Sequence, residues 1–183
     1  MADKDLAAEV AELRAEIRRL ADIEQIRDLQ YGYWRAIDLK QPEALRDLFA
    51  PGEILIEFED MPVWRDRDAF VQFFIDLGMD PNRQENHFGL SPAIRIEGPD
   101  DASGTWRLHM FAYNFDSRIT IRISGLYDAR YVRRDGRWWI SQLVFRRHSL
   151  FSEQVGADGA VTAPGFGNVA SDAAAHLFGE AKD

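Results

Sequence analysis

Three ionisable residues interrupt apolar stretches of the 183-residue sequence and could carry chemistry: Asp38, Glu57 and His87. Asp38 follows the stretch QYGYWRAI, Glu57 lies within the alternating segment EILIEFE, and His87 opens another partly apolar segment. Burying a charged group costs free energy unless the group is paired or changes its protonation state. Ionisable residues in such positions are therefore candidates for proton transfer, which is the usual role of a catalytic imidazole.

Each of these residues also has a purely structural explanation. Asp38 could end a helix at the protein surface, and Glu57 could point to solvent from a half-buried strand. His87 could be a hydrogen-bonded histidine of the core. Residue type alone leaves both interpretations open for all three positions.

Several other kinds of active site lack their characteristic patterns here. The sequence contains no cysteine, which excludes a thiol nucleophile, a disulfide and a thiolate metal site. We find no closely spaced histidine pair typical of a metal site and no glycine-rich turn typical of phosphate binding. No Ser, His and Asp form a recognisable nucleophile motif. We therefore expect catalysis without a metal or another cofactor.

The overall charge argues against a nucleic-acid partner. The formal net charge is −9, whereas phosphate binding needs clustered Lys and Arg. The one basic cluster surrounds a turn and is interpreted as a solvated hairpin tip; it comprises Arg130, Arg133, Arg134 and Arg137. No apolar run approaches the length of a membrane span, and the first ten residues have no signal-peptide core. We expect a soluble, cytoplasmic protein without a membrane partner.

The elements that must position these residues begin with a long helix over residues 4–38. Five apolar residues in its first half are spaced by four and three residues in alternation, which is typical of a heptad seam. They are Leu6, Val10, Leu13, Ile17 and Leu20. The seam is expected to pack on the same domain or on a sister subunit. From Ile23 the apolar set shifts, so we expect a bend or a change of packing partner near residues 20–22.

The rest of the chain predicts two shorter helices followed by a β-meander, which is an α+β arrangement. The helices are expected at 42–50 and 66–78, and the strands at 53–59, 87–97, 102–115, 117–133 and 137–149. Asp135-Gly136 predicts a tight hairpin between the last two strands. Aromatic residues make up 12% of the sequence, which fits either an aromatic-lined cavity or a well-packed core. Residues 150–183 are interpreted as a loose tail with a weak helix near 170–178.

Four segments together resemble the SnoaL-like and scytalone dehydratase-like group of the nuclear transport factor 2-like superfamily. They fall in order between residues 23 and 145 and read IEQIRDLQYGYWRAIDLKQPEALRDLFAP, DRDAFVQFF, ENHF and GLYDARYVRRDGRWWISQL. The resemblance implies a cone-shaped α+β fold, with N-terminal helices packed on a highly curved, mostly antiparallel sheet that encloses a pocket. It divides the chain into an N-terminal helical arm (1–22), an NTF2-like domain (23–149) and a C-terminal tail (150–183).

The resemblance also implies roles for Asp38 and His87. In that group an Asp at the end of the first core helix pairs with a His about 48–54 residues later, and here 87 − 38 = 49. The pair is a general base in which the carboxylate orients the imidazole and fixes its tautomer.

Three further residues align with catalytic positions of the group. Tyr33, five residues before Asp38, matches the tyrosine of the bile-acid dehydratase type, while the scytalone dehydratase type has a tyrosine where this chain has Ile37. Glu57 aligns with a second pocket tyrosine, which implies a hydrogen-bond acceptor or a second acid–base group. Tyr127 aligns with a pocket amide and would restore a phenol donor.

An apolar wall for the substrate is implied by the same alignment and by strand parity. Its expected members are Trp34, Phe88, Trp106, Leu108, Met110 and Ala112. Ala112 stands where the group has a second histidine, and His109 is expected to face away. Arg146 or Arg147 could reach the pocket mouth and bind an anion, but we favour a solvated strand end as the interpretation of both residues.

These residues predict a cofactor-independent lyase that acts on a small, largely hydrophobic, aromatic hydroxylated molecule. The reaction would be dehydration or C–C cleavage, such as formaldehyde release from a lignin-derived diarylpropane. An isomerase or cyclase with the same pair, and a non-catalytic binding or small subunit of this fold, are the alternatives. The group usually assembles, so we expect a homo-oligomer, either a dimer or a trimer.

Overall fold

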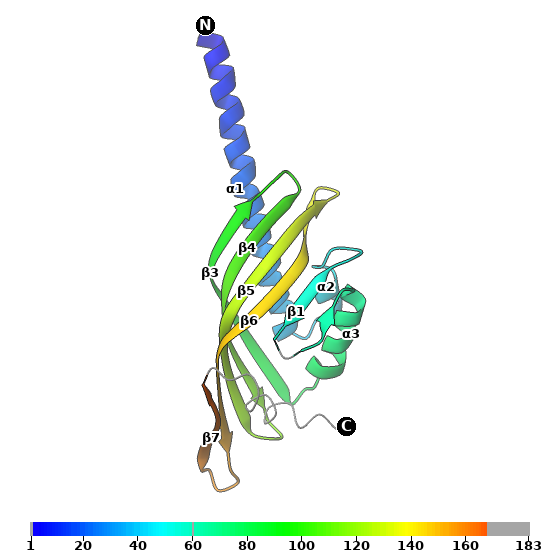
Figure 1. The fold of residues 1–183 in the computed structure, drawn as a ribbon, viewed down its shortest axis with the longest axis vertical. Coiled ribbons are helices and arrows are strands. Elements are labelled where there is room, and N and C mark those ends of the chain that lie inside the picture. Colours follow the sequence, from blue (N-terminus) through cyan, green and yellow to red (C-terminus); the bar gives the residue numbers. More distant parts are fainter. Residues whose placement is uncertain (1, 60, 168–183) are drawn as a thin grey trace.

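The computed structural model describes residues 2–59 and 61–167, and its ribbon shows helices packed against one strongly curved sheet (Figure 1). The helices are α1 (Ala2–Asp38), α2 (Pro42–Arg46) and α3 (Arg67–Gly78). The strands are β1 (Leu55–Phe58), β2 (Val63–Trp64), β3 (Arg83–Ile96), β4 (Asp101–Asn114), β5 (Ile119–Arg134), β6 (Arg137–Val155) and β7 (Val161–Gly167). The predicted cone-shaped α+β architecture is confirmed.

The sheet is mostly antiparallel and runs in the order β2-β1-β6-β5-β4-β3, with β7 paired to β6. The β1–β6 pair is parallel. At the β5–β6 hairpin, Asp135 and Gly136 have φ values of 52° and 76°, the left-handed conformation that a tight two-residue hairpin turn needs. This turn confirms the predicted hairpin. The β5–β6 pairing beyond it places Tyr127 opposite Phe145, and both residues line the cavity.

The C-terminal half of α1 packs across the sheet, and its N-terminal half extends beyond it (Figure 1). The change occurs at Asp22, whose carboxylate accepts a hydrogen bond from the Trp138 indole at 3.1 Å and pairs with Arg133 at 2.5 Å. The predicted change of packing partner at residues 20–22 is confirmed, while α1 stays one continuous helix. Arg133 also lies over the Trp138 ring, so the interpretation of its cluster as a solvated tip is wrong for this residue.

Two boundaries differ from the sequence-based expectation because tertiary pairing extends the sheet. β3 begins at Arg83, four residues before the expected start, and pairs along its length with β4. β6 continues to Val155 and pairs with β7. The prediction that the tail is loose from residue 150 onward is therefore wrong for the residues of these two strands. Leu150 and Ser152 are buried in this extension, which explains why it remains a strand. The helix expected near 170–178 lies outside the described residues.

Two smaller elements also depart from the expectation. α2 ends at Arg46, and residues 47–50 form a turn and a bridge to β6 instead of continuing the helix. β2 is an additional short strand that pairs with β1. Among the described helices, none combines the length and apolar character needed to cross a lipid bilayer.

Candidate active site

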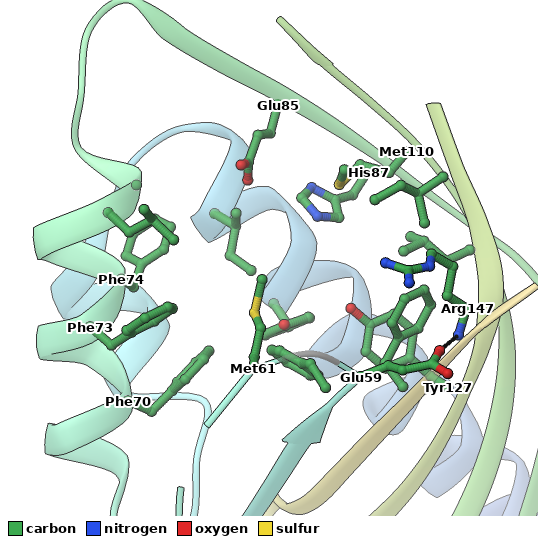
Figure 2. Close-up of a pocket in the computed structure, with 18 of the residues that line it drawn as sticks. Glu59, Met61, Phe70, Phe73, Phe74, Glu85, His87, Met110, Tyr127 and Arg147 are labelled. Atoms are coloured by element: carbon green, nitrogen blue, oxygen red, sulfur yellow. Dashed lines mark hydrogen bonds between the residues drawn. The ribbon is translucent and has the colours of Figure 1, made fainter. Parts of the chain in front are cut away.

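A cavity of about 150 Å³ opens between α1, α3 and the concave face of the sheet. Most of its wall is apolar and aromatic, with a small number of polar groups (Figure 2). The aromatic lining consists of Tyr33, Phe58, Phe70, Phe73, Phe74, Tyr127 and Phe145. An apolar hollow with few convergent polar groups is the usual form of a small-molecule site.

Asp38 and His87 meet at one wall of this cavity. Asp38 is the last residue of α1, and its Oδ2 accepts the His87 backbone N–H at 3.0 Å while its Oδ1 lies 2.6 Å from His87 Nδ1. The His87 side chain is only 7% exposed, and its imidazole points into the cavity (Figure 2). Because an ionised carboxylate can only accept, we assign the proton to Nδ1, which leaves Nε2 with a lone pair.

Two buried phenols, Tyr33 from α1 and Tyr127 from β5, form a second part of the wall. Their rings meet edge to face with centroids 6.2 Å apart. Burial raises the pKa of Tyr33 far above its ordinary value, and the nearby Tyr127 and Glu85 raise it further. Burial also raises the pKa of Tyr127, and side-chain hydrogen bonds with Tyr33 and Trp34 lower it by less than burial raises it. Both phenols therefore stay protonated and can donate hydrogen bonds.

Glu57 does not line the cavity, so its predicted catalytic role is wrong. Its carboxylate pairs with Arg146 at 2.5 Å on the other face of the sheet, where both side chains are partly exposed. Successive residues of a strand point to opposite faces, and it is the next residue, Phe58, that lines the cavity. The family tyrosine that aligned with Glu57 therefore has no counterpart at this position.

The sequence did not show which of Arg146 and Arg147 reaches the pocket, and the structure distinguishes them. Arg146 faces outward, whereas Arg147 lines the cavity and its guanidinium points into it (Figure 2). The Arg147 backbone N–H donates to Glu59 at 2.8 Å, which ties β6 to the end of β1. The cavity thus holds a cation fixed to a rigid strand.

Of the predicted apolar wall, Leu108 and Met110 line the cavity from β4. The prediction that Phe88 belongs to this wall is wrong. Phe88 is 50% exposed and contacts Phe111 on the outer face, because strand alternation turns it away when His87 points inward. His109 also lies on the outer face, as expected.

Three other residues of the predicted wall are buried but lie outside the lining. Trp34 packs edge to face on Trp106 with centroids 5.5 Å apart, and the Trp106 indole donates to Tyr131 at 2.9 Å. Ala112 is likewise buried without lining the cavity. These side chains support the cavity from the core instead of contacting a substrate.

An ion pair in the cavity wall was missed by the sequence reasoning. Arg83 and Glu85 lie 2.6 Å apart, with their side chains 20% and 15% exposed, and both line the cavity. They share strand parity with His87, and Figure 2 shows Glu85 and His87 on the same strand. Alternation in RQENH could have identified them, but the strand was expected to begin only at His87.

The described residues contain no group of three or more Asp, Glu or His side chains arranged to hold a metal ion. The charged side chains that line the cavity are instead His87, which Asp38 holds, the Arg83–Glu85 pair, Glu59 and Arg147. Such an arrangement can move a proton at the imidazole and stabilise negative charge at the guanidinium.

Comparison with known proteins agrees with this geometry. The sequence model of the SnoaL-like domain matches residues 18–144. Among solved structures, a hexachlorocyclohexane dehydrochlorinase, LinA-type3 from Novosphingobium barchaimii LL02, is 19% identical with a TM-score of 0.65, over 81% of this chain and 93% of that one. A candidate scytalone dehydratase from Novosphingobium aromaticivorans DSM 12444 is 18% identical with a TM-score of 0.66, over 89% and 97%. At these identities the likeness shows a common fold.

Proposed function

This chain belongs to the SnoaL-like domain family, and we propose that its cavity catalyses cofactor-independent elimination from a small, apolar, single-ring molecule. The observation that carries the proposal is the double contact between Asp38 and His87 at the cavity wall. A carboxylate-held imidazole with its free nitrogen available to an apolar hollow is suited to remove a proton from a substrate.

In the proposed reaction, His87 Nε2 takes a proton from a substrate carbon while Asp38 stabilises the imidazolium that forms. The C–H electron pair becomes the new double bond, and the bond to the leaving group on the adjacent carbon breaks. A hydroxyl group leaves as water after the imidazolium returns the proton to it. An anionic leaving group departs unprotonated, and the imidazolium then loses its proton to solvent.

Arg147 and the two phenols can stabilise the negative charge that this reaction develops on the substrate. A guanidinium near the reacting centre stabilises charge that develops on a leaving group or on a carbonyl oxygen. Tyr33 and Tyr127, with their raised pKa values, act as hydrogen-bond donors to substrate oxygen atoms. General base catalysis typically contributes about 10²–10⁴-fold, so positioning in the water-poor cavity must supply the remaining acceleration.

The cavity volume narrows the substrate class. An apolar cavity of about 150 Å³ is large enough to hold a benzene ring. A single six-membered ring therefore fits inside, whereas the second aryl group of a diarylpropane would have to extend through the open side of the cavity. Hexachlorocyclohexane, named for the dehydrochlorinase relatives, is also a single ring. These facts favour loss of water or of a halide over release of formaldehyde.

The direct test is turnover of a panel of cyclohexanols, cyclic hydroxy-ketones and halogenated cyclohexanes, followed by mass spectrometry. We expect a product that has lost water or hydrogen halide, and a loss of at least about 10²-fold in kcat for His87→Gln. His109→Gln is the matched control, since His109 is exposed on the outer face. Undiminished turnover in His87→Gln would eliminate the proposed base.

An isomerase or cyclase with the same pair is the second candidate, because Arg147 and the phenols could equally hold an enolate oxygen. The two functions differ in their products: isomerisation leaves the substrate mass unchanged. Solvent deuterium would enter the product if His87 returns the proton to carbon. Binding without turnover or exchange across the panel would instead favour the binding-subunit alternative.

A further inference from the structure

The N-terminal half of α1 carries an apolar seam that its own domain leaves uncovered. The five seam residues are exposed by 59, 37, 58, 65 and 50% and are Leu6, Val10, Leu13, Ile17 and Leu20 in that order. Figure 1 shows this half of α1 extending away from the sheet. Single exposed apolar residues are ordinary, but a continuous stripe of them marks an interaction surface. We call residues 6–20 the arm.

We propose that the arms of two copies of this chain pair as a parallel, two-stranded coiled coil. The seam spacing assigns Val10 and Ile17 to heptad position a and Leu6, Leu13 and Leu20 to position d. β-branched residues at a combined with leucine at d favour two parallel strands over three or four. The residue types on the arm therefore select one partner, a second copy in the same orientation.

The flanking charges fit the same arrangement. Glu9 occupies position g and Arg14 the following position e, so in a parallel dimer each Glu9 faces Arg14 of the partner subunit. An antiparallel dimer would instead place g against g and e against e. Glu9 and Glu16 would then face acidic residues, and Arg14 would face another arginine. Charge complementarity thus favours the parallel orientation.

The seam also faces away from the domain to which the arm belongs. At 100° per residue, the arm seam and the core-facing residues Asp22, Ile26 and Tyr33 lie about 180° apart around α1. A second helix can therefore cover the seam while each domain stays on the outside of the pair. The seam is short, but Asp22 is anchored to Trp138 and Arg133, so the arm extends a helix that is already fixed at its base.

The first test measures the mass of the full chain by sedimentation at several micromolar concentrations. We expect a dimer for the unaltered chain and a monomer for Ile17→Lys, which places a charge in the seam. Ala15→Lys is the matched control, because it adds the same side chain at position f on the outer side of the arm. A monomeric or trimeric unaltered chain, or a dimer that survives Ile17→Lys, would overturn the proposal.

Charge reversal tests the partner's orientation. Glu9→Lys and Arg14→Glu should each weaken self-association by roughly 10-fold, since each creates two like-charge contacts. Mixing these two variants should produce a heterodimer, because the introduced lysine then faces the introduced glutamate while the natural Glu9 and Arg14 still face each other on the opposite side. Stronger self-association of Glu9→Lys would mean an antiparallel pair and contradict the proposal.

Cross-linking provides a readout that does not depend on affinity. The natural sequence has no cysteine, so Leu6→Cys introduces a single thiol at the outer end of the seam. A parallel, in-register dimer brings the two thiols together, and mild oxidation should yield a disulfide-linked dimer. Absence of this product in Leu6→Cys at concentrations where the chain is dimeric would rule the parallel arrangement out. Retained helical circular dichroism verifies that each variant is folded.

Discussion

Asp38 contacts His87 at two points, through the backbone N–H at 3.0 Å and through Nδ1 at 2.6 Å. The two contacts hold both the strand and the imidazole ring against the end of α1. A single carboxylate therefore joins the long helix to β3 and fixes the tautomer of the histidine. This relationship underlies the first prediction.

Asp38→Asn should lower kcat by about 10²-fold or more with little change in KM. The amide preserves size but can donate to Nδ1, which would move the proton to Nε2 and remove the base from the cavity. Steady-state kinetics measure the loss, and nitrogen NMR shifts of His87 report the tautomer. If the tautomer changes while kcat stays the same, His87 does not act as the base.

Substitution of Arg147 should reduce kcat, whereas substitution of its neighbour Arg146 should not. Arg147→Met removes the cation that points into the cavity, and we expect kcat to fall by about 10²-fold. The contact from the Arg147 backbone to Glu59 would remain, so β6 should keep its position. Arg146→Met is the control and should leave kcat unchanged, as should Glu57→Gln, because these two side chains pair on the outer face. Equal losses in Arg146→Met and Arg147→Met would contradict a cavity role for Arg147.

These pairs illustrate what the sequence can and cannot determine. The pairing of Asp38 with His87 was implied by the family resemblance, in which an Asp at the end of the first core helix pairs with a His about 48–54 residues later. The structure places the two side chains in contact. Which of Arg146 and Arg147 faces the cavity depends on a register shift in β6, opposite Arg130 and Tyr131, that cannot be recognised in the sequence. Glu57 was misplaced for a different reason: the alignment took precedence over alternation in its own strand.

The alternation of side chains along β3 predicts the orientation of two further residues. Once His87 points inward, alternation turns Phe88 outward and brings Glu85 inward. The prediction failed here because the start of the strand at Arg83 depends on pairing with Asn114, more than 30 residues away. The long-range pairing that defines a sheet edge is therefore the information that local sequence lacks. The arm seam, by contrast, needs only local spacing and was identified directly.

Gly89 should tolerate no side chain. A Cβ built at this position would lie 1.8 Å from the Trp34 ring, which packs across β3 in the core. Gly89→Ala must displace this ring and is expected to lower the free energy of unfolding by about 3 kcal/mol. Urea denaturation measures the change. Gly98→Ala is the control, since its nearest neighbour would be 4.0 Å away, and it should cost less than about 0.5 kcal/mol. Equal stability of the two variants would mean that Trp34 has room to move.

Alkaline pH should destabilise the fold through its buried phenols. Burial raises the pKa of Tyr33, Tyr127 and Tyr131 above the ordinary value of 10.0. Below about pH 10 these phenols are protonated in both the folded and the unfolded chain, so they contribute no pH dependence. Above that pH the unfolded chain loses protons that the folded chain retains, and the free energy of unfolding therefore falls as pH rises.

Tyr131→Phe isolates this effect from the cavity, because Tyr131 donates to Gln30 in the core. Its removal should cost stability at pH 8, where the hydrogen bond is lost, and should flatten the decline between pH 10 and 11 relative to the unaltered chain. Urea denaturation at these pH values, with tyrosinate absorbance recorded in parallel, provides the measurement. The same slope in both proteins would mean that Tyr131 titrates in the folded state like an exposed phenol.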